Sequence, residues 1–171
     1  MLKSENKKAE SVKIKEVIKA LERFAPLPLQ ESWDNAGLQV GLTEAEVSGA
    51  LLCLDVTCQI VDEAIAKGCN LIVSHHPLIF RKLSRLTGED YVQRCVMKAL
   101  AHGIVILSLH TNMDNAKGGV NYKIAEKMAA SVNPTCRPAL SQLSCKGRGA
   151  KRSRASITSF IFTLFSLYVC R

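Results

Sequence analysis

The alternation of short apolar runs with segments that carry helix signals constrains the fold of this chain more than any other feature. Apolar runs occupy residues 50–54, 71–73 and 104–109, and a weaker one occupies 38–40. Runs of this length are typical of strands rather than helices. We expect helices between and around them, at residues 12–24, 58–67, 91–102 and 120–130. Strands that are apolar throughout indicate a parallel sheet buried on both faces. The sequence therefore predicts an α/β fold, a parallel-sheet lobe with helices on both faces.

The charge distribution divides the chain into two parts. All 15 acidic residues lie at or before Glu126, and eight of the 23 basic residues follow it. The net charge of +8 therefore belongs to one end of the chain, and we expect no specific nucleic-acid partner. We assign residues 1–142 to the folded lobe. Residues 143–171 are basic and then apolar, and we expect them to lie outside the core.

Three interpretations of residues 143–171 remain open. They form a disordered basic linker with an aggregation-prone end, a basic tail that touches a membrane surface, or an out-of-frame terminus. We favour the third, because composition and patterning change together. The apolar run in this region is too short to span a bilayer.

Cysteine usage and the first residues indicate a reducing compartment. The chain starts with the polar stretch MLKSENKKAE, which lacks the apolar region of a secretory signal. Its seven cysteines are odd in number, and no pair has C-x-x-C spacing. We therefore expect a cytoplasmic protein without a membrane span and without a cysteine zinc site.

Two predicted strands are each followed directly by residues that bind metals. His75 and His76 follow the run at 71–73, and His110 and Asp114 follow the run at 104–109. Ligands of parallel sheets bind beyond the carboxyl ends of the strands, so these side chains should meet at one edge. The alternatives are exposed loop histidines and an Asp114 that caps the next helix. We favour a divalent-metal site, in which His110 is a ligand, an orienting group or a proton shuttle.

Further polar residues have two interpretations each. Asp55 ends the run at 50–54, so it either supports the metal site or forms a turn with Thr57. Asp34 and Asn35 either line the cavity or form a turn, and we favour the turn. No P-loop, dinucleotide fingerprint or G-x-S-x-G nucleophile elbow is present in the sequence.

Four ordered motifs give the chain a family resemblance. WDNAGLQVG, CLDVT, LIVSHHPLIF and HTNMDNAKGGVN occur in this order between about residues 12 and 140. Together they resemble the NGG-one-interacting-factor-three-like family, also called GTP cyclohydrolase 1 type 2 homologues. The resemblance implies that His75, His76 and Asp114 bind a dinuclear metal centre. It also implies two similar lobes, toroidal homo-hexamers and a cytosolic location.

The chain departs from this family pattern near its end. The family supplies a further His and Glu, four residues apart, in a second lobe. After Asp114 this chain has no His, and its only Glu is Glu126. We therefore expect the second lobe to be missing and the site to lack about two of its five ligands.

Two functions follow from these expectations. The family's cyclohydrolase name implies metal-dependent hydrolysis of a nucleotide or another small molecule, inactive or impaired in this chain. The alternative is a non-catalytic metal-binding or protein-interaction module. Mixed His and carboxylate donors accept Zn, Mn, Fe, Co or Ni, so the sequence does not select a metal.

Overall fold

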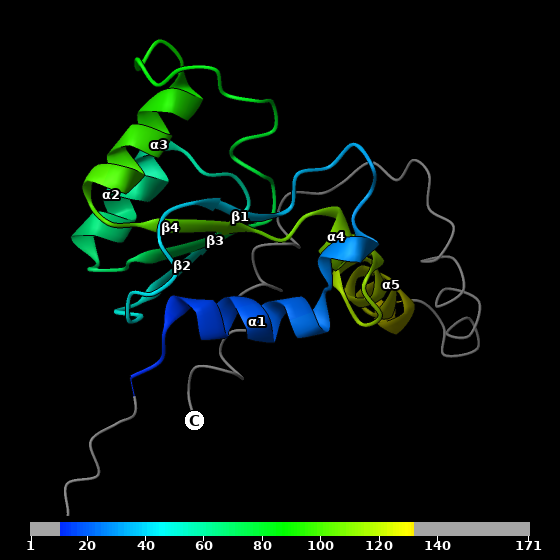
Figure 1. The fold of residues 1–171 in the computed structure, drawn as a ribbon. Helices are drawn as coiled ribbons and strands as arrows, with labels where there is room; N and C mark the ends of the chain where they lie inside the picture. The colour runs from blue at the N-terminus through cyan, green and yellow to red at the C-terminus, as the bar shows by residue number, and fades with distance from the viewer. Residues whose placement is uncertain (1–10, 132–171) are drawn as a thin grey trace, which may run out of the picture.

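The structure is a computed structural model that describes residues 11–131 (Figure 1). The predicted tail at 143–171 lies outside the described residues. The secondary-structure elements occur in the order α1 (Ile14–Phe24), η1 (Leu27–Leu29), β1 (Gly37–Val40), β2 (Ala50–Cys53), α2 (Cys58–Ala66), β3 (Leu71–Ser74), α3 (Tyr91–Ala101), β4 (Val105–Ser108), α4 (Thr111–Asn115) and α5 (Val120–Ser131). They confirm the predicted α/β class.

The four strands form one sheet in the order β1-β4-β3-β2. β2 pairs with β3, and β3 with β4, in parallel, as the sequence predicts. β1 instead pairs with β4 in the antiparallel direction, which corrects the expectation of a purely parallel sheet. An antiparallel edge strand on an otherwise parallel sheet is common. The short apolar run at 38–40 held no signal of direction.

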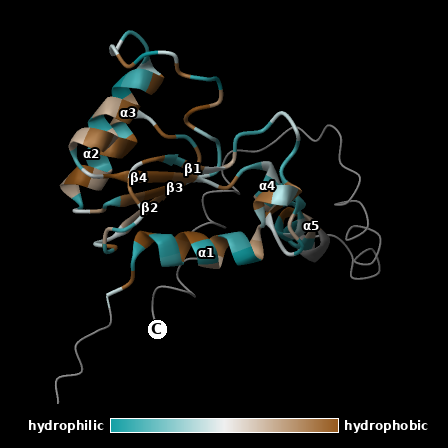
Figure 2. Cartoon of the chain, in the orientation of Figure 1, coloured by the Kyte–Doolittle hydropathy of each residue, from teal (hydrophilic) through white to brown (hydrophobic). Residues whose placement is uncertain are grey.

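Alternate residues of the central strands face opposite helical layers. Leu71 and Leu107 pack with α1, α4 and α5, whereas Ile72 and Ile106 pack with α2 and α3. All four side chains are fully buried. Figure 1 shows α2 and α3 on one side of the sheet and α1 on the other, and Figure 2 shows the apolar strands between them. The predicted cover of helices on both faces is confirmed.

The helix ends show where local sequence signals succeed and fail. Thr57 caps α2 by accepting a hydrogen bond from the Ile60 backbone N–H, as expected from its position. Ser11 is of a residue type that favours helix N-caps and stands just before the expected first helix, but it donates its hydroxyl hydrogen to Glu46 instead. The helix starts later, where the Glu16 carboxylate accepts from the Lys13 backbone N–H. Within the described residues, no helix is both long and apolar enough to cross a membrane.

Candidate metal centre

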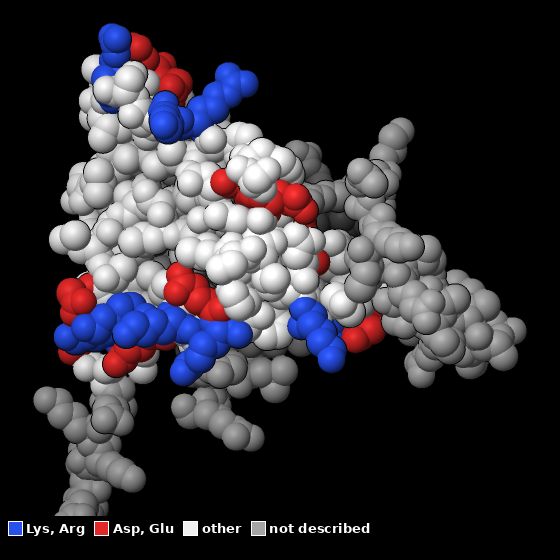
Figure 3. Space-filling model, turned by 45° about the vertical axis from the view of Figure 1, so that its right-hand side comes forward, with Lys and Arg blue, Asp and Glu red and all other residues white. Residues whose placement is uncertain are grey.

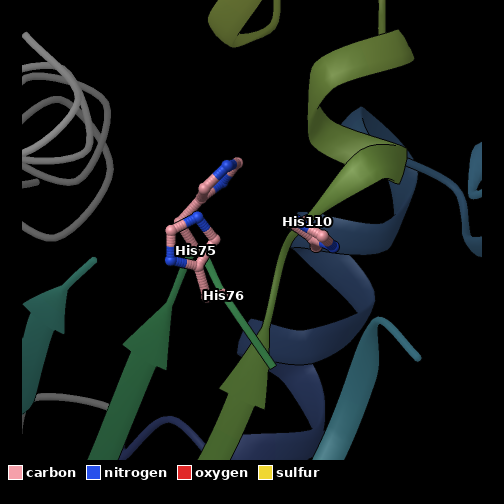
Figure 4. Close-up of side chains that lie close together, drawn as sticks. All are labelled: His75, His76 and His110. Carbon is pink, nitrogen blue, oxygen red and sulfur yellow. The ribbon is translucent and has the colours of Figure 1, made fainter. Parts of the chain in front are cut away.

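The register of the central strands places three histidines at one edge of the sheet. Ser74 at the end of β3 pairs with Ser108 at the end of β4. His75 and His76 follow the first of these residues and His110 comes shortly after the second, so the three emerge at the same end of the sheet (Figure 4). The convergence predicted from the strand-then-histidine order is present.

Backbone hydrogen bonds continue the sheet beyond the strands and fix these positions. The His75 N–H donates to Cys53 O at 3.1 Å, and the His76 N–H donates to Leu54 O at 2.9 Å. On the other side, the Leu109 N–H donates to Ser74 O at 2.9 Å. The main chain that bears the imidazoles is therefore part of the sheet ladder rather than a loose loop.

The three imidazoles form a compact cluster. One potential ligand nitrogen from each of His75, His76 and His110 lies within 4.8 Å of the others. Their ring centroids are 5.0, 5.3 and 5.5 Å apart. His75 and His110 are buried, whereas His76 is partly exposed. Three neutral imidazoles around one point are a donor set that divalent transition metals accept.

Hydrogen bonds orient the two histidines of β3. Nδ1 of His75 lies 2.9 Å from the Leu109 carbonyl oxygen. A carbonyl oxygen only accepts, so this Nδ1 bears the proton and Nε2 is the basic nitrogen. Nδ1 of His76 lies 2.7 Å from Oδ1 of Asp55. Asp55 therefore contacts a histidine of the cluster, as the first of its two interpretations requires.

The third histidine is held by a buried carboxylate. Nδ1 of His110 lies 2.8 Å from Oδ1 of Asp34, whose side chain is fully buried. The other oxygen of Asp34 accepts from the Thr111 backbone N–H at 3.0 Å and from the Thr111 hydroxyl. Burial raises the pKa of Asp34, but the hydrogen bonds from Thr111 and His110 together hold this pKa below its usual value. Asp34 is thus an ionised acceptor for His110.

Asp114 lies next to this cluster. It belongs to α4, is 8% exposed, and places Oδ1 at 3.8 Å from Nε2 of His75. Two donors that bind one ion, each at about 2.0–2.2 Å, have a separation of this order. The alternative interpretation of Asp114 as an N-cap does not fit its place inside α4.

The structure also reveals site residues that the sequence did not favour. Asp34 was interpreted as a turn former, yet its carboxylate contacts His110 and Thr111. Thr111 was not singled out at all. Asp34 and His110 are 76 residues apart in the chain, so no local pattern could pair them. The two residues lie in two separate motifs of the family resemblance, WDNAGLQVG and HTNMDNAKGGVN.

A family model agrees with the motifs and the fold. The model for Duf34/NIF3 (NGG1p interacting factor 3) matches residues 12–163, which is most of the chain. The chain belongs to the DUF34/NIF3 family. The predicted resemblance is therefore confirmed.

Curated relatives of this DUF34/NIF3 chain are longer than the chain itself. A GTP cyclohydrolase 1 type 2 homolog of Clostridium acetobutylicum is 41% identical over 111 residues, which are 65% of this chain and 41% of the relative. A homolog of the same name from Staphylococcus aureus is 41% identical over 117 residues, 68% of this chain and 32% of the relative. The chain thus spans less than half the length of these relatives.

Solved structures of the family share this fold. A Bacillus cereus protein related to NIF3 matches with a TM-score of 0.67 and 38% identity, over 71% of this chain and 33% of that one. Reduced HcgD from Methanocaldococcus jannaschii matches with a TM-score of 0.64 and 32% identity, over 70% and 48% of the two chains. The fold that positions the three histidines is therefore shared with these solved structures.

Proposed function

We propose that this DUF34/NIF3 chain binds a divalent metal ion through His75, His76 and His110. The observation that supports the proposal most strongly is the hydrogen-bond pattern that the three rings share. Each Nδ1 lies against an oxygen acceptor, so each Nε2 is the basic nitrogen that a metal would bind. Metal-binding histidines in proteins have this second hydrogen bond, which fixes the tautomer and raises the basicity of the ligand.

Asp114 offers a second arrangement of the same site. An ion held by His75, His76 and Asp114 would match the ligand set implied by the family resemblance. His110, oriented by Asp34, would then be positioned to accept or deliver a proton. The two arrangements differ in whether replacement of His110 removes the metal or leaves it bound.

We propose metal-dependent hydrolysis of a small molecule as the activity of the complete site. A bound divalent ion would polarise a substrate and lower the pKa of a bound water. The role of this chain's residues is to hold the imidazoles in position and to keep Asp34 ionised beside His110. The name of the relatives, GTP cyclohydrolase 1 type 2 homolog, suggests a nucleotide substrate.

One observation favours a non-catalytic role as the second candidate. The chain spans 41% and 32% of the two curated relatives, and no histidine follows His110 in its sequence. Three histidines and Asp114 can hold an ion, whereas a second ion requires additional donors to offset the repulsion between the two. The second candidate is therefore a metal-binding or interaction module with little hydrolytic activity.

Calorimetric titration with zinc tests the metal proposal. The histidines at 75, 76 and 110 are each replaced by Ala, and His102→Ala is the matched control. The chain has four histidines, and His102 is exposed, with Nδ1 at 2.9 Å from Lys98 O at the end of α3. We expect His75→Ala and His76→Ala to weaken zinc binding by more than the roughly 10–100-fold effect of an outer partner, and His102→Ala to have no effect.

The titration also distinguishes the candidate functions. Loss of zinc in His110→Ala supports the three-histidine arrangement, whereas retained zinc with lost nucleotide hydrolysis supports a proton-transfer role. Zinc binding without hydrolysis of GTP in the unmodified chain supports the non-catalytic module. Zinc affinity that is equal in the unmodified chain and in all three cluster variants would contradict metal binding at this site.

A further inference from the structure

We propose that Trp33 and Phe80 form an aromatic wall beside the histidine cluster that stacks against a planar heteroaromatic ring of the substrate. This inference rests on the proposed function, because it assigns a substrate class to the same site. Trp33 is 59% exposed and Phe80 is 51% exposed, although both are large and apolar. Because the two exposed rings are neighbours, they form an apolar patch, and such patches can mark ligand-binding sites.

The wall is continuous with the metal-binding residues. The ring centroids of Trp33 and Phe80 are 6.1 Å apart, and the two planes are tilted by 50°. The Trp33 ring lies 6.0 Å from the His110 ring at an angle of 76°. A flat molecule that stacks on these rings would therefore have its edge at the histidines, where a hydrolytic reaction would occur.

The two loops that bear the wall are tied to each other. The Asn35 side-chain amide donates to Ile79 O at 2.6 Å. The Ile79 N–H in turn donates to Oε1 of Gln39 at 3.1 Å. Between Trp33 and Asn35, Asp34 is anchored on Thr111 and His110. The rings are consequently held in place before a ligand arrives, which reduces the entropy lost on binding.

The neighbouring charges indicate that the ring is attached to an anionic group. Arg81 and Lys82 follow Phe80 directly, and both are exposed. A phosphate on the ligand can be neutralised by such side chains without burial of an unpaired charge. Aromatic side chains stack on any base because each base has a π-face, so the wall selects for planarity rather than for one ring.

A small ligand fits the wall better than a protein surface does. A stable protein–protein interface buries about 800 Å² on each partner and involves some 20–30 residues a side. Two tilted rings provide a much smaller area, and the residues around them are polar or charged: Asp34, Asn35, Arg81 and Lys82. Contact with a second copy of the chain is the alternative, and the experiment must distinguish it from binding of a small ligand.

Fluorescence of the 171-residue chain tests the proposal directly. Trp33 is the only tryptophan of the chain, so its emission reports on the wall alone. The probe is guanosine 5′-monophosphate, and ribose 5-phosphate is the control that has the anionic group without a ring. We expect the nucleotide to quench Trp33 emission and ribose 5-phosphate to leave it unchanged. The titration is performed with and without zinc.

Substitutions at the wall complete the test. Phe80→Leu should weaken nucleotide binding by about tenfold in calorimetry, a typical effect of removing one stacking ring. The matched control is Tyr91→Leu, since Tyr91 is 56% exposed and shows no ring contact with the wall or the cluster within the described part of the chain. Zinc affinity should be unchanged in both variants.

The outcomes separate this inference from the proposed function. If zinc binds at the histidines but the nucleotide neither quenches Trp33 nor depends on Phe80, the wall proposal is wrong and the metal proposal stands. If the nucleotide quenches Trp33 in a chain that does not bind zinc, the wall stands without the metal. A change of sedimentation coefficient in Phe80→Leu, without nucleotide binding in the unmodified chain, would assign the wall to a protein contact instead.

Discussion

At the scale of single residues, the site depends on how each imidazole is oriented. The three Nδ1 atoms lie 2.7–2.9 Å from Asp55, Asp34 and the Leu109 carbonyl oxygen. Of these acceptors, Asp34 is the most constrained, because its second oxygen also accepts from Thr111. Its side chain is buried, so water cannot replace the interaction with His110. The hydrogen bond to Asp34 therefore fixes the orientation of the His110 ring.

Replacement of Asp34 by Asn tests this dependence. The shape is retained, but the ionised acceptor for the Nδ1–H of His110 is lost. We expect Asp34→Asn to weaken zinc binding by about 10-fold or more, within the 10–100-fold range of such partners. The measurement is a calorimetric zinc titration. Asp62→Asn is the control, since Asp62 is an exposed carboxylate paired with Lys98. Equal zinc affinity in both variants would show that Asp34 does not act through His110.

The sequence predicted the site unevenly at this scale. His75, His76 and His110 were identified because each follows an apolar strand, and the parallel register of β3 and β4 brings those ends together. Asp34 was misinterpreted because its partner lies 76 residues away, and a local pattern favours a turn. Strand exits are local signals, whereas a carboxylate that orients an imidazole is a tertiary contact.

At the scale of elements, the turn between α4 and α5 sets the position of Asp114. The Gly119 N–H donates to Ala116 O at 2.9 Å, which closes this turn. A Cβ atom at Gly119 would lie 2.9 Å from that same oxygen and would clash with the Met113 carbonyl oxygen. Only a glycine therefore allows α5 to start this close to α4.

Gly119→Ala should destabilise the chain and disturb the site together. We expect a loss of about 1–3 kcal/mol in the free energy of unfolding, as for other overpacked positions. Urea denaturation measures this loss, and zinc titration measures the effect on the site. Gly68→Ala is the control: its φ of +66° makes Ala costly, but no atom lies within 4 Å of a Cβ there. Both variants should lose stability, but only Gly119→Ala should lose zinc affinity; the reverse pattern would refute this role of the turn.

The packing of α2 and α3 against the sheet leads to a separate prediction, which concerns the reactivity of the cysteines. Burial raises the pKa of the Cys53 thiol to about 12, and burial together with the neighbouring Cys58 raises that of Cys95 to about 12. The thiolate is the reactive form, so at pH 8 only about one molecule in ten thousand is reactive at either site. Among the four cysteines of the described residues, iodoacetamide labelling followed by mass spectrometry should modify the partly exposed Cys58 and Cys69 before the buried Cys53 and Cys95. Rapid labelling of Cys53 in the folded chain would contradict the packing of α2 and α3.

The direction of β1 shows why the fold was predicted only in part. The lengths and apolar character of β2, β3 and β4 indicate buried parallel strands, and the glycines after α2 and α3 mark the helix ends. β1 has four residues, as each of the other strands has, but its Leu38 is 45% exposed, as is typical of an edge strand. Whether an edge strand runs parallel or antiparallel depends on the path of the preceding loop. That path is held by contacts such as Glu31 with Thr111, which no local pattern encodes.

At the scale of the whole molecule, neither sign of charge dominates the face drawn in Figure 3. Figure 3 shows Lys and Arg side chains interspersed with Asp and Glu on the visible face. This mixture agrees with the balance of charges before residue 127. The described part of the chain therefore offers no single basic surface on this face for a nucleic acid.

Exposed apolar side chains predict that the chain associates with itself. Leu42 is 83% exposed, and Met128 and Leu100 are 55% and 50% exposed. The family resemblance implies homo-hexamers, and this chain spans 41% of the Clostridium acetobutylicum relative. We expect analytical ultracentrifugation to detect species larger than the 18.7 kDa monomer at micromolar concentration. A single monomeric species at every concentration would contradict self-association.

X-ray absorption of the zinc-loaded chain tests the central claim most directly, because it identifies the ligand atoms around the ion. The orientation of His75, His76 and His110 predicts three imidazole nitrogens at about 2.0–2.1 Å and one ion per chain. The same spectrum should persist in His102→Ala and lose imidazole scattering in His75→Ala. A zinc shell dominated by sulfur, or by oxygen without imidazole, would show that the metal does not bind at the edge of the sheet between β3 and β4.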